Sequence, residues 1–465
     1  PESLSIETEE WSARLTWPSV EDEFFSHYVV YRETQNGPQK VGETQETFFF
    51  ESPLDSATEY LYRVVAVSID DIESDAVVGK ATTLEATRPP LEVEVLEMED
   101  IFSNTYKIYE SDGIADVRII NNTPGTIAKL KVSFFIKDFM DLPSEVELEE
   151  LEPKGTRELT LKAVFNNRIL AITEDTPVQV EISLCHYRNQ EPCTFSKSLS
   201  LNVFEKHRLS WDVKERFATF VTPKDPVILE FARSVVTQYP EISDPLRQGG
   251  VLFDALGIVG LTYLPDPSNP YQMTSGQTDY IDYIQYPRET LQRRSGDCDD
   301  LVGLYSAMHE SLGVRTMVLE TPGHMFMMFD STLPVEKKPE GMGAMFVEYE
   351  GTLWIPVEVT LVGSPFLKAW ETAAESVEQY KESGLGMMDI RSSWEGFKPA
   401  SLPAFAWRPE TVLREDIDAK YSDLARLDKI RLRLLGNAYY EVLKDRPDDV
   451  EALLQLAILA AEEGE

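Results

Sequence analysis

The sequence predicts a multidomain protein in which two all-β sandwiches precede an α+β domain and an α-helical tail. Apolar and polar residues alternate with period two in short runs up to about residue 212, a pattern typical of sandwich strands. From about residue 222 the apolar spacing becomes helical, and two helices joined by a turn end the chain. A chain of 465 residues has material for three or four domains. We expect their boundaries at residues 1–87, 91–212, 220–410 and 411–465.

The first region alternates short strands with clusters of turn residues. Its strand patterns lie at residues 14–17, 28–32 and 60–67. Four residues resemble the segment of fibronectin type III domains that carries their tyrosine corner, and Trp17 resembles the core tryptophan; the four are Leu54, Thr58, Tyr60 and Arg63. The resemblance implies a spacer or a surface for protein contacts, with no chemistry of its own.

The second region also reads as a β-sandwich, with strands at residues 115–122, 129–136 and 178–184. It resembles an immunoglobulin-like domain. Cys185 and Cys193 bracket a short loop at a strand end. They can pair as a disulfide across a hairpin or remain free, and the sequence leaves both possibilities open. His186 beside Cys185 is only a weak indication of a metal site.

The chemistry of the α+β domain is expected around Cys298. Ser295 and Gly296 indicate a turn, and the apolar residues after Cys298 recur at steps of three and four until Gly313. This spacing predicts an amphipathic helix with Cys298 in its first turn. Unpaired backbone N–H groups and the positive end of the helix dipole favour a thiolate there. The position therefore indicates a nucleophile.

A proton acceptor and a group to orient it follow along the chain. His324 comes after a Pro322-Gly323 turn and opens an apolar strand. Residues 346–358 predict a hairpin that turns at Gly351 and ends on the carboxylate of Glu358. A cysteine on a helix, a histidine at the mouth of a strand and a carboxylate beside it are the parts of a catalytic triad. Singly, each residue also fits an ordinary structural role.

Three segments together resemble the transglutaminase-like cysteine enzymes of the papain-like superfamily: Gly-Asp-Cys-Asp-Asp at 296–300, Pro-Gly-His at 322–324, and residues 351–358. The resemblance covers roughly residues 225–405. It implies Cys298 as nucleophile, His324 as general base and acid, and Glu358 as the residue that orients His324. The family normally has Asp at the third position, so Glu358 is a departure from its pattern.

Two parts of this site stay open at the level of sequence. The oxyanion of the reaction needs a second donor besides the Cys298 N–H, and the candidates are Gln285, Tyr286 and Gln272. Asp299 and Asp300 place negative charges beside the thiol, which raise the thiol pKa or else bind a cation. Asp297 and Asp299 flank the cysteine on either side. Some periplasmic cysteine proteinases of the superfamily are similar in binding calcium through flanking carboxylates. No other cofactor is expected.

Two further segments carry expectations. Residues 331–345 read as an insertion between the histidine strand and the hairpin, either a lid or specificity element or a passive surface loop. In the tail, residues 430–443 and 450–461 predict helices around a turn at 446–449. Their apolar register resembles a boundary between tetratricopeptide repeats and implies that the array continues past residue 465. A helical cap on the preceding domain is the alternative.

Composition limits the partners. The formal net charge is −38, from 81 acidic and 43 basic residues spread along the chain. Such a surface repels nucleic acid and anionic membranes, so neither is an expected partner. No apolar run reaches the length of a membrane span. Sandwich and repeat modules suit protein partners, and extracellular-type sandwiches favour a location outside the cytoplasm, in a bacterial periplasm or envelope.

The expected function is cysteine-dependent amide hydrolysis, as in a protease or amidase, or acyl transfer on protein or peptide substrates. It rests on Cys298, His324 and Glu358, and hydrolysis is preferred because bacterial members of the family are often proteinases. The alternative is a non-catalytic scaffold that uses the same fold to bind protein. A buried thiol at Cys298 favours that alternative.

Overall fold

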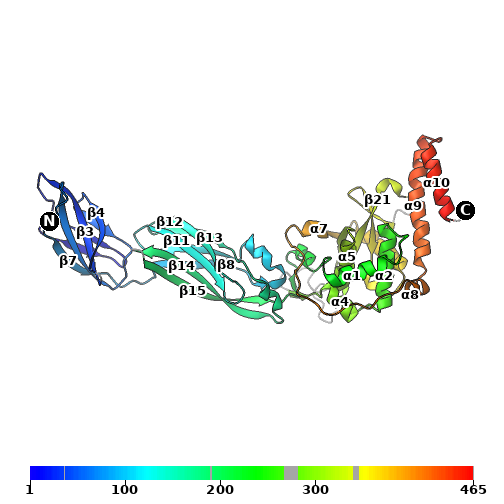
Figure 1. The fold of residues 1–465 in the computed structure, drawn as a ribbon, viewed down its shortest axis with the longest axis horizontal. Helices are drawn as coiled ribbons and strands as arrows, with labels where there is room; N and C mark the ends of the chain where they lie inside the picture. Colours follow the sequence, from blue (N-terminus) through cyan, green and yellow to red (C-terminus); the bar gives the residue numbers. More distant parts are fainter. Residues whose placement is uncertain (36, 189–190, 266–280, 339–344, 464–465) are drawn as a thin grey trace. The chain divides into compact units, whose positions relative to one another are not determined.

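A computed structural model describes the chain except for residues 36, 189–190, 266–280, 339–344 and 464–465 (Figure 1). The chain divides into two compact units. The first consists of Pro1–Ile101, Tyr106–Ala171 and Asp175–Val203, and the second of Phe102–Thr105, Ile172–Glu174 and Phe204–Glu465. Two β-sandwiches lie mainly in the first unit, whereas the predicted α+β domain and helical tail lie in the second.

The first sandwich has two sheets over a core that includes Trp17, Tyr28 and Tyr62. One sheet has the order β1-β2-β5, from Ser5–Thr8, Ala13–Thr16 and Phe48–Glu51; the other has the order β4-β3-β6-β7, from Gly37–Thr44, Phe25–Thr34, Glu59–Ser68 and Val77–Thr82. The backbone N–H of Asp55 donates to the hydroxyl oxygen of Tyr60 over 2.8 Å. This bond is the tyrosine corner that the sequence predicted.

The second sandwich pairs a three-stranded sheet with a five-stranded one. The smaller sheet has the order β13-β10-β8, from Thr156–Leu161, Ala115–Asn121 and Leu91–Met98. The larger has the order β12-β11-β14-β15-β9, from Ser144–Leu151, Ile127–Ile136, Thr176–Arg188, Glu191–Phe204 and Ile101–Phe102. Cys185 is a free cysteine; Thr194 lies opposite it in the register of β14 and β15, whereas Cys193 lies opposite His186.

An antiparallel sheet of order β22-β23-β21-β20-β24 organises the second unit. Its strands are Val347–Tyr349, Thr352–Val357, His324–Pro334, Thr316–Thr321 and Gly386–Asp389. Successive residues of β21 enter different apolar clusters: Met325 and Met327 lie in one, and Phe326 and Met328 in the other. Because both faces of the sheet are covered, the strand is apolar at every buried position rather than at alternate ones.

Helix α5 (Cys298–Ser311) begins at Cys298, as predicted, but it is not amphipathic. Every residue from Cys298 to Glu310 is buried, including Asp299, Asp300 and His309. The helix packs against β21 on one side and against α1 (Pro226–Val236) and α4 (Pro287–Arg293) on others. A sequence pattern cannot show this enclosure, since the polar residues on the helix would ordinarily face solvent.

Helix α2 (Pro245–Val259) contains both Gly249 and Gly250 in its interior. The Asp244 carboxylate caps the helix by accepting from the Arg247 N–H over 3.0 Å. A Cβ at Gly249 would lie 2.5 Å from the Phe329 ring, and one at Gly250 would lie 2.4 Å from Leu427. The glycines therefore allow close packing rather than ending the helix.

The predicted insertion at 331–345 begins as strand. β21 continues to Pro334, with a shift of register between Asp330 and Leu333, and the short helix η4 (Val335–Lys337) follows. Further on, Glu350 and Gly351 have positive φ values of 47° and 82° between the paired residues Tyr349 and Thr352. This two-residue turn has the geometry that matches strand twist in hairpins, and it confirms the turn predicted at Gly351.

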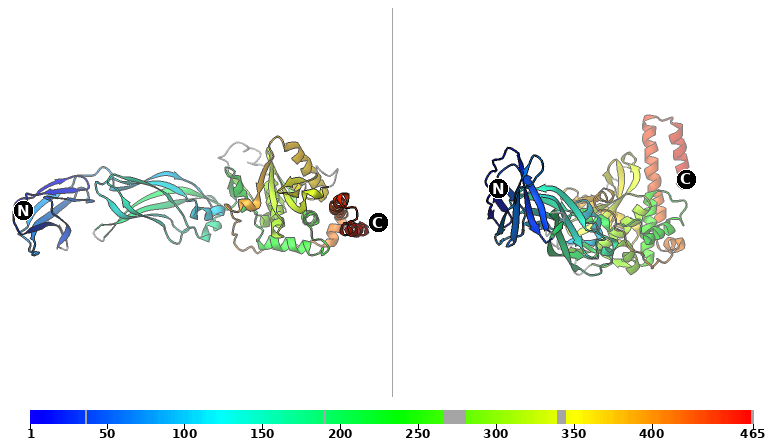
Figure 2. Two further views of the ribbon diagram at one scale, coloured as in Figure 1. Left: turned by 90° about the horizontal axis from the view of Figure 1, so that it is seen from above. Right: turned by 60° about the vertical axis from the view of Figure 1, so that its left-hand side comes forward.

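The tail consists of α8 (Arg414–Lys420), α9 (Asp423–Asp445) and α10 (Val450–Glu463), of which α9 and α10 lie side by side (Figure 2). Helix α9 begins at Asp423 rather than at Ile430. The Asp423 carboxylate accepts from the Leu367 N–H over 3.1 Å, so contacts with the preceding domain hold its first turns. No helix in the described parts of the chain is long and apolar enough to cross a membrane.

Candidate active site

Cys298 is the first residue of α5, and the residues before it form a short parallel bridge. Strand β19 (Ser295–Gly296) pairs with β17 (Thr262–Tyr263), and the Leu264 N–H donates to the Gly296 carbonyl over 2.9 Å. These bonds hold the turn that leads into the helix. The Cys298 side chain is only 2% exposed.

His324 opens β21 immediately after a tight turn. Thr321 and His324 are paired across it, and Gly323 has a φ of 73°, as expected where Pro and Gly occupy the two central positions. The backbone N–H of the next residue, Met325, acts to lower the pKa of the Cys298 thiol, and β21 packs against α5. The histidine strand therefore begins beside the cysteine.

Glu358 holds the other side of the imidazole. Its Oε2 lies 2.7 Å from His324 Nε2. Its Oε1 accepts from the backbone N–H of Thr360 over 3.2 Å and from the Thr360 hydroxyl over 2.5 Å, at the start of the short helix η6 (Val359–Leu361). Both carboxylate oxygens are thus fixed.

The electrostatic environment keeps the thiol protonated. Burial, the charge of Asp297 and the charge of Glu358 raise the pKa of the Cys298 thiol to about 12, from an ordinary value of 9.0. The N–H groups of Met325 and Asp299 oppose this rise. Desolvation and the adjacent carboxylates therefore penalise the thiolate more than the helix terminus favours it, contrary to the expectation from the helix dipole.

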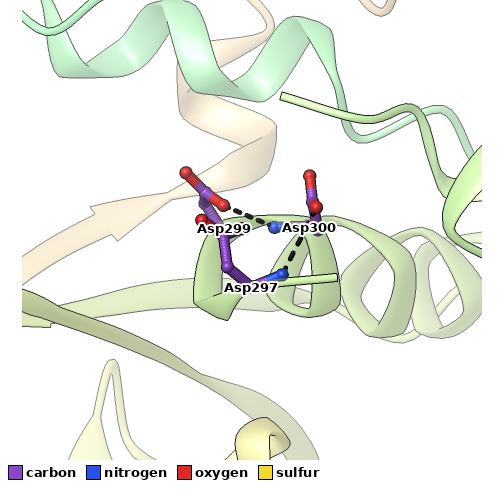
Figure 3. Close-up of side chains that lie close together, drawn as sticks. All are labelled: Asp297, Asp299 and Asp300. Atoms are coloured by element: carbon purple, nitrogen blue, oxygen red, sulfur yellow. Dashed lines mark hydrogen bonds between the residues drawn. The ribbon is translucent and has the colours of Figure 1, made fainter. Parts of the chain in front are cut away.

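Asp297, Asp299 and Asp300, which are neighbours of Cys298 in the sequence, form a buried acidic cluster (Figure 3). Each offers an oxygen, and these oxygens lie within 4.8 Å of one another. Burial and a hydrogen bond with Asp297 raise the pKa of Asp299 well above its usual range, and burial and the Asp297 charge raise the pKa of Asp300 to about 7. Burial therefore disfavours the ionised forms of Asp299 and Asp300.

The cluster fits a hard cation in part. Oδ1 of Asp297 is buried and has no hydrogen-bond partner among the described residues. Calcium prefers oxygen ligands but takes six to eight of them, so three carboxylates would need water or backbone oxygens to complete the shell. The sequence suggested Asp297 and Asp299 for this role. Asp300, which the sequence placed beside the thiol as a charge or a cation ligand, has its carboxylate in the same cluster.

Two of the three oxyanion candidates have their donors engaged elsewhere. The Gln285 N–H donates to Asp300 Oδ1 over 2.7 Å, and the Gln285 amide nitrogen donates to Asp300 Oδ2 and to the Ser295 carbonyl. The Tyr286 hydroxyl donates to the Lys206 carbonyl over 3.0 Å. Gln285 therefore fastens the segment before α4 to the cysteine helix. The third candidate, Gln272, lies outside the described residues.

Sequence reasoning missed Tyr263. It lies in β17 in register with Gly296, and β17 also packs against η6, which Glu358 begins. Burial and the charges of Cys298, Asp297 and Glu358 raise the pKa of Tyr263, so its hydroxyl lies within their electrostatic reach. The only local signal was a short apolar run, Val259 to Leu264, which gives no hint of a pairing across thirty residues of chain.

Comparisons with known proteins give similar solved structures but no family. No protein-family model matches the chain, and no curated protein matches it. Similar solved structures include the fibronectin type III domain FN3tt, with 18% identity, 18% of this chain and 94% of that chain covered, and a TM-score of 0.17. A two-domain fibronectin type III segment of chicken tenascin has 16% identity, 43% and 98% coverage, and a TM-score of 0.18.

A fibronectin type III domain of human fibronectin type III domain containing protein 3 has 18% identity, 19% and 91% coverage, and a TM-score of 0.17. TM-scores this low carry no argument about fold or function. The fibronectin type III-like character of the first sandwich rests on its own strand order and tyrosine corner. The transglutaminase-like and tetratricopeptide resemblances stay predictions.

Proposed function

We propose that the α+β domain is a cysteine-dependent amidase or peptidase of the transglutaminase-like kind, acting on protein or peptide substrates. One observation carries the proposal. His324 is bonded to Glu358 over 2.7 Å at the start of β21, and β21 packs against α5, whose first residue is Cys298. The elements that carry a nucleophile, a base and a group that orients the base are therefore neighbours in the fold.

The geometry suggests how a proton would move. With Nε2–H donating to Glu358, the neutral imidazole keeps its lone pair on Nδ1. Nδ1 would take the thiol proton as Sγ attacks the amide carbonyl carbon, and His324 would then return that proton to the departing amine. The resulting thioester would be released by water, which gives hydrolysis, or by an amine, which gives acyl transfer.

The oxyanion of the tetrahedral intermediate needs preorganised donors. The N–H groups of the first turn of α5 supply one side. Because Gln285 and Tyr286 are engaged elsewhere, Tyr263 is the better candidate for the second donor, since it lies in register with Gly296 and the Cys298 charge acts on the pKa of its hydroxyl.

The neighbouring domains support a protein substrate and a location outside the cytoplasm. Two β-sandwiches and a helical pair, which resembles the start of a tetratricopeptide array, suit a protein substrate and protein partners. A location outside the cytoplasm, in a bacterial periplasm or envelope, agrees with the resemblance of the sandwiches to extracellular modules. Hydrolysis is preferred over cross-linking on the same ground of resemblance.

A second function, a non-catalytic scaffold, is favoured by one specific observation. The Cys298 thiol is 2% exposed and its pKa is about 12. A thiol of this kind is nearly inert at neutral pH unless substrate, a cation or a proton on the carboxylates changes its surroundings. If the domain is a scaffold, Cys298 is a core residue, and the acidic cluster has the structural role of binding Gln285 through Asp300.

The two functions are separated by alkylation of Cys298 with iodoacetamide, located by peptide mass mapping, with and without calcium. For the enzyme we expect labelling that calcium accelerates and that His324→Ala slows by about tenfold or more. His27→Ala, in the first sandwich, is the matched control and should leave the rate unchanged. Slow labelling that responds neither to His324→Ala nor to calcium would instead favour the scaffold.

A further inference from the structure

The first sandwich carries a pocket between two loops that no part of the proposed chemistry uses. Residues 17–24 connect β2 to β3, and residues 69–76 connect β6 to β7. The Ile69 N–H donates to the Phe24 carbonyl over 2.8 Å, which ties one loop to the other. Between them lies a cavity of about 380 Å³, within the size range of ligand sites in proteins.

Hydrogen bonds to Ser68 stabilise the second loop, residues 69–76. The Ser68 N–H donates to the Ile72 carbonyl over 3.0 Å, and the Ser68 hydroxyl oxygen accepts from the Ile72 N–H over 3.2 Å. An isolated bridge between Val67 and Glu73 closes its base. The pocket is therefore formed before any partner arrives, and binding would cost little ordering of the loops.

Large apolar side chains stand exposed at this pocket. Phe24 is 52% exposed, Ile72 is 68% exposed, and Ile69 beside them is 62% exposed. Phe24 and Ile72 line the cavity, and buried Ala66 and Val67 form its floor. Scattered exposed apolar residues need no explanation, but a group of them around a hollow marks an interaction site.

The same loops carry only negative charge. Residues 17–26 and 68–76 contain no Lys, Arg or His and seven carboxylates, of which Asp22, Asp70 and Glu73 line the cavity. Opposite charge in a partner would steer it to this end of the sandwich and select its register. A second copy of this chain is disfavoured as the occupant, because each copy has a net charge of −38.

We propose that this pocket, defined by Phe24, Ile72 and the carboxylates of the two loops, binds a basic segment of another protein. The segment would insert a large apolar side chain into the cavity and place flanking Lys or Arg side chains against Asp22, Asp70 and Glu73. The surface would thereby recruit a cationic protein partner, and it does so whether or not Cys298 is catalytic.

Binding is tested on the full chain by fluorescence anisotropy with a labelled short peptide that has Leu-Trp at its centre and two lysines on each side. We expect saturable binding that weakens as NaCl rises from about 50 to about 500 mM. Ile72→Ser and, separately, Asp70→Lys should each weaken it by about tenfold. Val78→Ser is the matched control, since Val78 is 52% exposed on β7 outside the pocket.

Two companion peptides test whether binding needs both the basic and the apolar residues. One has glutamates in place of the lysines, and the other has alanines in place of Leu-Trp. Both should bind much more weakly. The proposal is overturned if the acidic peptide binds as well as the basic one, if Ile72→Ser and Val78→Ser bind alike, or if no binding is measurable. If sedimentation shows a dimer that Ile72→Ser abolishes, the occupant of the pocket is a second copy of this chain, and the proposal is overturned.

Discussion

Replacing Asp297 by Asn should make Cys298 more reactive. The thiol pKa of about 12, against the ordinary 9.0, leaves about three orders of magnitude less thiolate at neutral pH than a free cysteine has. Asp297 is the largest charge that contributes to this rise. One charge beside a partly solvated group is worth about 1–4 kcal/mol, which corresponds to about one to three pKa units. Burial remains, so the variant's pKa should fall to about 10–11.

The assay is the rate of iodoacetamide alkylation between about pH 6 and pH 11, in a background with Cys185→Ser and Cys193→Ser so that only Cys298 reacts. With calcium removed, Asp297→Asn should react about 10- to 100-fold faster than the parent at neutral pH. Calcium should accelerate the parent, because a cation offsets the carboxylate charges, and should have less effect on the variant. A parent thiol that titrates near 9, or a rate unchanged by Asp297→Asn, would refute the electrostatic reasoning.

Three further outcomes are expected. Glu358→Gln should lower Cys298-dependent turnover of peptide amides by about 100-fold or more, because the carboxylate that fixes the His324 tautomer is lost, with steady-state kinetics as the measurement. Gly249→Ala should lower the free energy of unfolding in urea by about 1–3 kcal/mol through its clash with a core ring, whereas Gly436→Ala, whose Cβ meets nothing nearer than 3.7 Å, should raise it by a few tenths to about 1 kcal/mol. Burial and a nearby carboxylate raise the pKa of Asp254 from 3.8 to about 8, so the folded state holds this proton more tightly than the unfolded state does. The free energy of unfolding should therefore fall as the pH rises from about 4 to about 8. Asp254→Asn should flatten this pH dependence, as measured by urea titrations at several pH values.

Local signals were sufficient for several elements of the second unit. A turn followed by apolar residues at helical spacing predicted a helix at Cys298, and Pro322-Gly323 predicted the turn before His324; both are present. Gly351 marked a hairpin whose two-residue turn requires positive φ. Each of these depends on the conformational preference of a few adjacent residues, which a single sequence records.

Local sequence signals could not predict the contacts between segments that are distant in the chain. Helix α2 continues through Gly249 because the Phe329 ring, far along the chain, packs where a Cβ would be. Helix α9 starts early because Asp423 bonds to Leu367. Gln285, expected as an oxyanion donor, is instead bound to Asp300, and Tyr263 reaches the site through a bridge to Gly296.

The sequence by itself determined the order of the elements, the first sandwich with its tyrosine corner, and which helix and strands carry Cys298, His324 and Glu358. These features follow from periodicity, turn chemistry and the spacing of a few residue types. Only the tertiary structure decided that the thiol is buried with a raised pKa, and that three carboxylates share one enclosed space. Desolvation and Coulomb interactions depend on what surrounds a group in three dimensions, and that environment comes from residues remote in the chain.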